Sequence, residues 1–277
     1  MKIKIKIRLI LLLVITCLVQ VQAQTQINKN KDRWRKGILV DEFIYTKAPF
    51  KSCHASTIAE TPNGLVSAWF GGSHERNPDV GIWLSRLIDG KWTAPVEVAN
   101  GIINDTLRFS TWNPVLYQVP DGDLLLFYKV GPKSAAWWGM MIRSSDSGKT
   151  WSKPETLPKG IEGTPKNKPI LLEDGTLICP SSATDEGGWR IYFEITKDFG
   201  KTWEKTDAIN KIYNYEAIQP TILTYNDGSL QALSRTKNRV ISSTWSHDNG
   251  KTWSLMQPSG LPNNNSGIDG VSLADGT

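Results

Sequence analysis

Cysteine and histidine are scarce in this chain: its 277 residues contain three of each. No combination of them has the spacing of a zinc site, because Cys53 and His54 form an isolated pair and His74 and His247 lie far apart. The sequence therefore predicts no metal site, and we expect no cofactor.

The chain also lacks a strong excess of charge of either sign. Its formal net charge of +5 is mostly due to four basic residues near the N-terminus, Lys2, Lys4, Lys6 and Arg8. They precede an apolar run over residues 9–21, which is too short to span a membrane and is followed by Ala23. This pattern is typical of a signal peptide, so we expect residues 1–23 to be cleaved and the mature chain to be secreted or periplasmic, without a membrane span.

Without the four basic residues, 28 Lys and Arg stand against 27 Asp and Glu. This balance provides no basic surface for nucleic acid, and we expect no such partner. In an oxidising compartment Cys53 and Cys179 are far apart in sequence. We expect two buried free thiols, although the spacing leaves a long-range disulfide open.

A helical period of 3.6 residues is missing as well, which excludes helical solenoids. In its place an octet with a central Asp, a Gly, a Thr and a Trp recurs three times, with its aspartates 52 and 50 residues apart. Residues 85–92 form an eroded fourth copy that lacks the Thr. The complete copies are residues 144–151, 196–203 and 246–253.

A second series of Asn-Gly or Asp-Gly pairs alternates with the octets. Flanked by apolar runs such as residues 124–128, these pairs are strong hairpin signals. Each unit of about 50 residues therefore contains four strands, which is the pattern of a β-propeller blade. The second series consists of Asn63-Gly64, Asp121-Gly122, Asp174-Gly175, Asp227-Gly228 and Asp275-Gly276.

The octet residues fit a structural role. The Asp can accept backbone N–H bonds in the turn, the Gly can take a positive φ, and the Trp can pack between sheets. Functional groups in a propeller gather where the inner strand of each blade enters the central funnel. The residues at these strand entrances are polar: His54, Trp112-Asn113, Asn167-Lys168, Gln219 and Asp269.

The octet resembles the Asp-box of the sialidase (neuraminidase) superfamily, and the chain from about His54 onward resembles bacterial Asp-box proteins labelled exo-α-sialidase. The resemblance implies an all-β fold, a six-bladed propeller of sialidase type over residues 24–277. At 50 residues per blade the chain supplies four to five blades, so we expect the C-terminal blades to be missing.

Sialidases bind the substrate carboxylate through three arginines, and use an aspartate as acid/base and a tyrosine assisted by a glutamate as nucleophile. In this resemblance Arg235 matches the second arginine, His54 replaces the first, and Gln219 stands at the position of the glutamate. The acid/base loop falls on residues 71–79 and offers Glu75 or Asp79. The tyrosine and the third arginine fall beyond residue 277.

We therefore expect a secreted glycosidase that removes a terminal acidic sugar, of sialic or uronic acid type, from a glycan. Its expected catalytic residues are Asp79, Glu75 and His54. Two other activities stay open: a polysaccharide lyase in which a His abstracts the proton, and a non-catalytic glycan-binding propeller. The expected substrate-binding residues are Arg235, Lys168, Asn167, Gln219, Asn113, Trp112 and Asp269.

Overall fold

The computed structural model describes residues 35–185, 188–211 and 213–273, so the expected signal peptide and the Asp275-Gly276 turn lie outside it. The chain divides into two compact units, residues 1–44 and 45–277. Every strand in the described ranges belongs to the second unit. No helix in the described ranges is long and apolar enough to cross a membrane.

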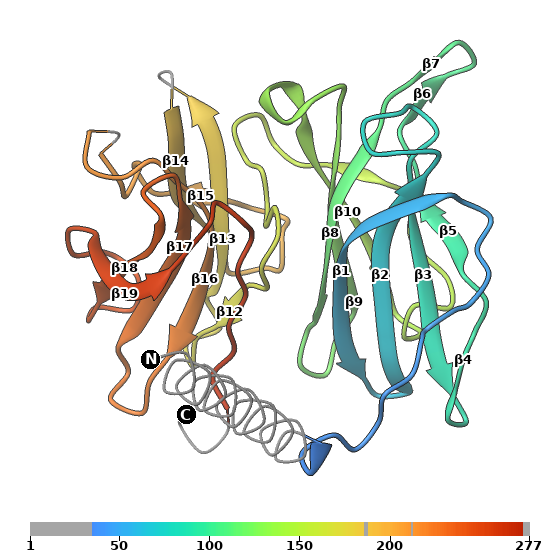
Figure 1. Ribbon diagram of the computed structural model, residues 1–277, viewed down its shortest axis with the longest axis horizontal. Coiled ribbons are helices and arrows are strands. Elements are labelled where there is room, and N and C mark those ends of the chain that lie inside the picture. Colours follow the sequence, from blue (N-terminus) through green and yellow to red (C-terminus); the bar gives the residue numbers. More distant parts are fainter. Residues whose placement is uncertain (1–34, 186–187, 212, 274–277) are drawn as a thin grey trace, which may run out of the picture. The chain divides into compact units, whose positions relative to one another are not determined.

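Four antiparallel sheets of at least four strands follow one another along the chain, as the repeat predicts (Figure 1). Blade 1 consists of β1 (Ser52–Thr61), β2 (Gly64–Gly72), β3 (Gly81–Ile88) and β4 (Lys91–Trp92), with β5 (Val96–Ala99) also paired to β3. Blade 2 consists of β8 (Thr111–Gln118), β9 (Leu124–Val130), β10 (Trp138–Ser144) and β11 (Glu155–Thr156).

Blades 3 and 4 repeat this order of strands. Blade 3 consists of β12 (Ile170–Leu171), β13 (Leu177–Asp185), β14 (Gly188–Thr196) and β15 (Glu204–Lys205). Blade 4 consists of β16 (Ala217–Thr224), β17 (Leu230–Thr236), β18 (Val240–Ser246) and β19 (Gln257–Pro262). A small hairpin of β6 (Ile102–Asn104) and β7 (Leu107–Arg108) and a 3-10 turn η1 (Ser134–Ala136) complete the elements of the described chain.

The octets form the turns expected of them. In the second blade, Asp146 Oδ1 accepts hydrogen bonds from the amides of Lys149 and Thr150, at 3.0 and 2.8 Å, and its Oδ2 accepts the Thr150 hydroxyl at 2.6 Å. Gly148 has a φ of 80°, a conformation that costs glycine little. The predicted structural role of the octet is therefore confirmed.

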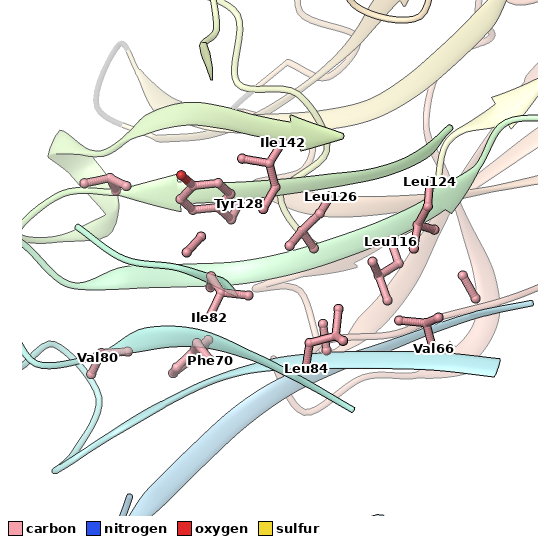
Figure 2. Close-up of a cluster of buried hydrophobic side chains, with 14 residues drawn as sticks. Val66, Phe70, Val80, Ile82, Leu84, Leu116, Leu124, Leu126, Tyr128 and Ile142 are labelled. Atoms are coloured by element: carbon pink, nitrogen blue, oxygen red, sulfur yellow. The ribbon is translucent and has the colours of Figure 1, made fainter. Parts of the chain in front are cut away.

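The octet tryptophans pack between blades, which also confirms their prediction. Trp151 packs against a cluster shared by blades 1 and 2, which Figure 2 shows with Val66 and Leu84 on one side and Leu116 and Leu126 on the other. Trp203 and Trp253 pack in the same way between blades 2 and 3 and between blades 3 and 4. Each Trp thus joins its own blade to the preceding one.

A buried set of ionisable side chains lies between blades 2 and 3. The carboxylate of Glu194 accepts hydrogen bonds from the amides of Glu162 and Gly163, at 3.0 and 2.6 Å, and from the Ser181 hydroxyl at 3.0 Å. Lys129 Nζ is fully buried 3.5 Å from Glu162 Oε2. Burial raises the pKa of Glu194 and lowers the pKa of Lys129, so each depends on its polar neighbours to remain charged.

Two expectations differ from the structure. The inner strand expected after Asp269 is not formed in residues 268–273, which contact β16 only through bonds such as the one from the Thr224 amide to Ser272 Oγ, at 2.8 Å. A strand needs a backbone partner, and the described residues offer this segment none from a blade of its own. Cys53 and Cys179 are both free, as expected. The prediction that both are buried is wrong for Cys53, which is exposed and accepts a hydrogen bond from Tyr45 Oη at 3.1 Å.

The octet turns predict a specific loss of stability in acid. Hydrogen bonds from the Thr252 hydroxyl and amide lower the pKa of Asp248 to about 2, and Thr150 and Thr202 lower the pKa of Asp146 and Asp198. Because the folded value lies below the unfolded one, near 4, this stabilisation is present above about pH 4 and is lost as the pH falls toward 2. The melting temperature of Asp248→Asn should therefore change less between pH 4 and pH 2 than that of the unsubstituted protein, as calorimetry can measure.

The matched control for this prediction is Asp105→Asn. Asp105 is exposed, and its carboxylate forms no hydrogen bond with the described residues. This variant should keep the acid slope of the unsubstituted protein. Equal slopes for all three proteins would contradict the role given to Asp248.

Candidate functional site

The inner strands of three blades are interrupted by the same irregularity at the same depth. The pairing register shifts between His54 and Thr57 in β1, between Trp112 and Val115 in β8, and between Ile218 and Thr221 in β16. Within each shift one residue that is not glycine has a positive φ: Ala55 (55°), Asn113 (36°) and Gln219 (54°).

Such bulges change the direction of the neighbouring side chains, and a backbone held outside its usual regions is typical of functional sites. Of the three residues only Asn113 is of the Asn or Asp type that accepts this conformation more readily, so Ala55 and Gln219 are held in it by the surrounding structure. The recurrence in three blades indicates that the bulges serve a common purpose. They shape one cavity.

All four blades contribute to that cavity, which has a volume of about 820 Å³. Blades 1 and 2 provide the bulges at His54 and Trp112-Asn113 together with the β2–β3 and β9–β10 loops. Blades 3 and 4 provide the segment at Lys166, the facing strands β13 and β14, and the residues Gln219 and Arg235. The predicted residues that line it are His54, Glu75, Trp112, Asn113, Gln219 and Arg235.

Arg235 on β17 is held in position by several contacts. Its Nε donates to Asn265 Oδ1 at 3.0 Å and its Nη1 to Gln219 Oε1 at 3.3 Å, and the guanidinium lies 5.1 Å from the centre of the Trp189 ring. Burial lowers the pKa of Arg235 from its ordinary value, and arginine remains charged in proteins. The Nη2 group has no hydrogen-bond partner among the described residues, so it is free to bind an anion.

Lys166 is a second cation in the wall, and the sequence did not single it out. Its Nζ donates to Asn167 Oδ1 at 3.0 Å and to the Ile268 carbonyl at 2.7 Å. Burial lowers the pKa of Lys166, whereas the charge of Asp269 raises it. Both acceptors of Lys166 are neutral, so its charge has no ion-pair partner within the described ranges.

The β2–β3 loop places Glu75 and Arg76 at the cavity, and Asp79 holds this loop together. The Asp79 carboxylate accepts hydrogen bonds from the Ser73 amide at 2.8 Å and from the Ser73 hydroxyl at 2.9 Å. Partial burial acts to raise the pKa of Asp79, but these hydrogen bonds outweigh it and the net shift is downward. Asp79 does not line the cavity, and its predicted acid/base role stays a prediction.

Three other predicted residues lie away from the cavity. Asn167 is buried behind it, where its Nδ2 donates to the carbonyls of Gln219 and Pro220, both at 3.0 Å, and so fixes the β16 bulge. Lys168 and Asp269 line a second cavity of about 540 Å³. The roles of all three in substrate binding stay predictions.

Aromatic rings form much of the remaining wall. Trp112 is buried and its Nε1 donates to the Gly131 carbonyl at 2.9 Å, while Trp137 meets it edge-on with ring centres 5.8 Å apart. Trp189 lies in the half of the cavity formed by blades 3 and 4. Aromatic faces of this kind suit the apolar faces of sugar rings.

Several residues of the wall could not be identified from the repeat pattern. Arg76 and Lys133 come from hairpin loops, and Trp189 comes from the start of β14, away from the octets. Lys166 precedes a predicted position by one residue. No group of three or more His, Cys, Asp and Glu side chains that could hold a metal ion occurs in the described part of the chain.

These blades, octet turns and interblade tryptophans define a β-propeller of the sialidase type. The chain belongs to the family of BNR repeat-like domains, whose model matches residues 63–277. Comparison with curated proteins gives no match.

Solved structures with the same fold share little sequence with this chain. A protein of unknown function from Dyadobacter fermentans is 19% identical with a TM-score of 0.69, over 83% of this chain and 74% of that one. The Hadza microbial sialidase Hz136 is 18% identical with a TM-score of 0.63, over 73% of this chain and 46% of that one. A variant of the NanB sialidase from Streptococcus pneumoniae is 14% identical with a TM-score of 0.67, over 88% of this chain and 58% of that one. The match thus spans about half of each sialidase, and at these identities it shows the fold alone.

Proposed function

We propose that this protein is a glycoside hydrolase that removes a terminal acidic sugar from a glycan. The observation that supports this most strongly is the cavity itself, which combines the free Nη2 of Arg235 with Lys166 and the carboxylate of Glu75. A sugar carboxylate is a planar anion that a guanidinium binds well. The likeness to sialidases supports the same class of substrate.

In this proposal Glu75 is the acid/base residue. Hydrolysis breaks the glycosidic C–O bond and a proton passes from the Glu75 carboxylic acid to the leaving oxygen. Water then supplies the hydroxyl that completes the released sugar, and its other proton returns to the Glu75 carboxylate. Glu75 is preferred to Asp79 because it lines the cavity, whereas the Asp79 carboxylate accepts the Ser73 hydrogen bonds that hold the loop, and these bonds lower its pKa.

His54 is the second protonatable group at the cavity, and it lies against the edge of Phe70 with ring centres 5.5 Å apart. We assign it proton transfer alongside Glu75, since an imidazole nitrogen can both accept and donate a proton.

The signal-peptide pattern further supports the proposal that the protein acts in the periplasm or outside the cell.

The test is to incubate the full-length protein with sialylated oligosaccharides and with uronate-containing polysaccharides, and to identify the products by mass spectrometry. The expected result is release of a free acidic sugar whose mass shows that one water molecule was added across the broken bond. An unsaturated uronate that absorbs in the ultraviolet would instead show a lyase using His54 as base. Binding without any turnover would show a non-catalytic glycan-binding propeller.

Arg235→Ala is expected to weaken recognition of acidic substrates specifically. Loss of a charge-assisted hydrogen bond of about 1.5–3 kcal/mol corresponds to a decrease in kcat/KM of roughly 10- to 100-fold. Binding of a neutral sugar of the same ring type should change little. Equal losses for neutral and acidic ligands, measured by titration calorimetry, would contradict the carboxylate role.

Arg235→Lys provides the control for folding. It keeps the positive charge near Trp189 but removes the planar fork that bonds Gln219 and Asn265. We expect it to melt near the temperature of the unsubstituted protein and to recover only part of the affinity.

A further inference from the structure

The cavity wall carries more positive charge than one carboxylate requires. Four cationic side chains line it, Arg76, Lys133, Lys166 and Arg235, against the single carboxylate of Glu75. None of the four forms an ion pair with a carboxylate in the described ranges. A surface cation is usually balanced by solvent or by a nearby acid, but four unpaired cations around one cavity create a field that attracts anions.

The four cations divide by blade into two groups, and in each case the same pair of blades also contributes a tryptophan to the wall. Arg76 and Lys133, with Trp137, come from the hairpin loops of blades 1 and 2. Neither cation has a hydrogen bond or ion pair to any other described side chain. Each group thus offers an apolar face and positive charge, the features that an acidic sugar ring needs. The second group is Lys166 and Arg235 with Trp189, from blades 3 and 4.

The two groups differ in how firmly they are held. Arg235 and Lys166 are fixed by hydrogen bonds to neutral acceptors, whereas Arg76 and Lys133 are exposed. A fixed cation loses less freedom when it binds a ligand, so the Arg235 group should provide the main binding site for a single acidic sugar. The Arg76 group would then add affinity only when a second negative charge is present.

The size of the cavity agrees with a ligand longer than one sugar. Its volume of about 820 Å³ lies near the upper end of the range of roughly 300–1,000 Å³ that holds drug-sized molecules. A single monosaccharide would leave one aromatic and cationic group without a ligand.

We propose that the cavity binds an oligosaccharide with two acidic sugars, one against Arg235 and Lys166 and the other against Arg76 and Lys133. The proposal rests on the glycan-binding part of the proposed function and specifies the substrate class further. The shared chemistry is a pair of negatively charged sugar rings, whether sialic or uronic acids.

The test measures binding to two matched pairs of probes by titration calorimetry: disialic acid against sialic acid, and digalacturonic acid against galacturonic acid. In at least one pair the dimer should bind at least tenfold more tightly than the monomer, and its affinity should fall more steeply with added salt. The double variant Arg76→Gln, Lys133→Gln should abolish this advantage and change binding of the monomer less than threefold.

The control is Lys149→Gln, which removes a positive charge from an exposed octet residue that does not line the cavity. It should keep the preference for the dimer. Three results would overturn the proposal. These are equal affinity for dimer and monomer in both pairs, no binding of either pair, and an equal loss of affinity for dimer and monomer in the double variant. Binding of the dimer without product release would contradict the hydrolase function and leave the two-charge site intact, so the two failures are distinguishable.

Discussion

Glu75→Gln is expected to lower kcat by roughly 100- to 10,000-fold while the substrate still binds. Glutamine keeps the size of the side chain at the cavity wall but cannot donate or accept the proton that hydrolysis transfers, and general acid/base catalysis contributes an effect of this size. Single-turnover kinetics with the acidic glycan that the protein hydrolyses would measure the loss separately from binding.

Asp79→Asn is the matched comparison for this variant. Asparagine can accept the Ser73 amide hydrogen bond through its amide oxygen and donate to the Ser73 hydroxyl through its NH2 group, so the loop should persist and kcat should change less than tenfold. A severe loss in Asp79→Asn with near-normal turnover in Glu75→Gln would transfer the acid/base role to Asp79.

Glu194→Ala should destabilise the protein by about 3–5 kcal/mol. The substitution leaves the amides of Glu162 and Gly163 without an acceptor and removes the charge that Lys205 approaches at 3.5 Å. Removing a buried ionised group lowers the free energy of unfolding by this much because its hydrogen-bond and ion-pair partners stay buried without a replacement. Urea unfolding followed by tryptophan fluorescence would measure the change.

Glu155→Ala provides the comparison at the surface of the same pair of blades. Glu155 is half exposed and its carboxylate lies 3.5 Å from Arg143 Nε. Such an exposed pair contributes about 0–1 kcal/mol. If Glu194→Ala destabilised the protein no more than Glu155→Ala, the buried network would not hold blades 2 and 3 together.

Most of the fold could be predicted from the repeat, because each of its turns depends on interactions between a few adjacent residues. An Asp that accepts amide bonds and a Gly with positive φ, as at Asp146 and Gly148, specify a turn from a few adjacent residues. The strands between such turns then follow from their length and alternation. The entrances of the inner strands were predictable for the same reason, and His54 and Gln219 both line the cavity.

The rest of the site depends on contacts that no local pattern encodes. Arg76, Lys133 and Trp189 lie outside the repeated positions and reach the cavity only through the packing of whole blades. Lys168 and Asn167 show that the position of a residue along a strand does not determine whether its side chain faces the cavity. The Asn167 amide turns inward to bond the β16 carbonyls, Lys168 lines the second cavity, and Lys166 takes the place in the wall that the spacing gave to its neighbours.

The most direct test of the account is a crystal structure of the protein with a bound acidic sugar, sialic or galacturonic acid. We expect the sugar carboxylate to lie within hydrogen-bonding distance of Arg235 Nη2, with the ring in the cavity that Glu75 and Trp189 line. A sugar bound instead in the second cavity, against Lys168 and Asp269, or with its carboxylate away from Arg235, would contradict it.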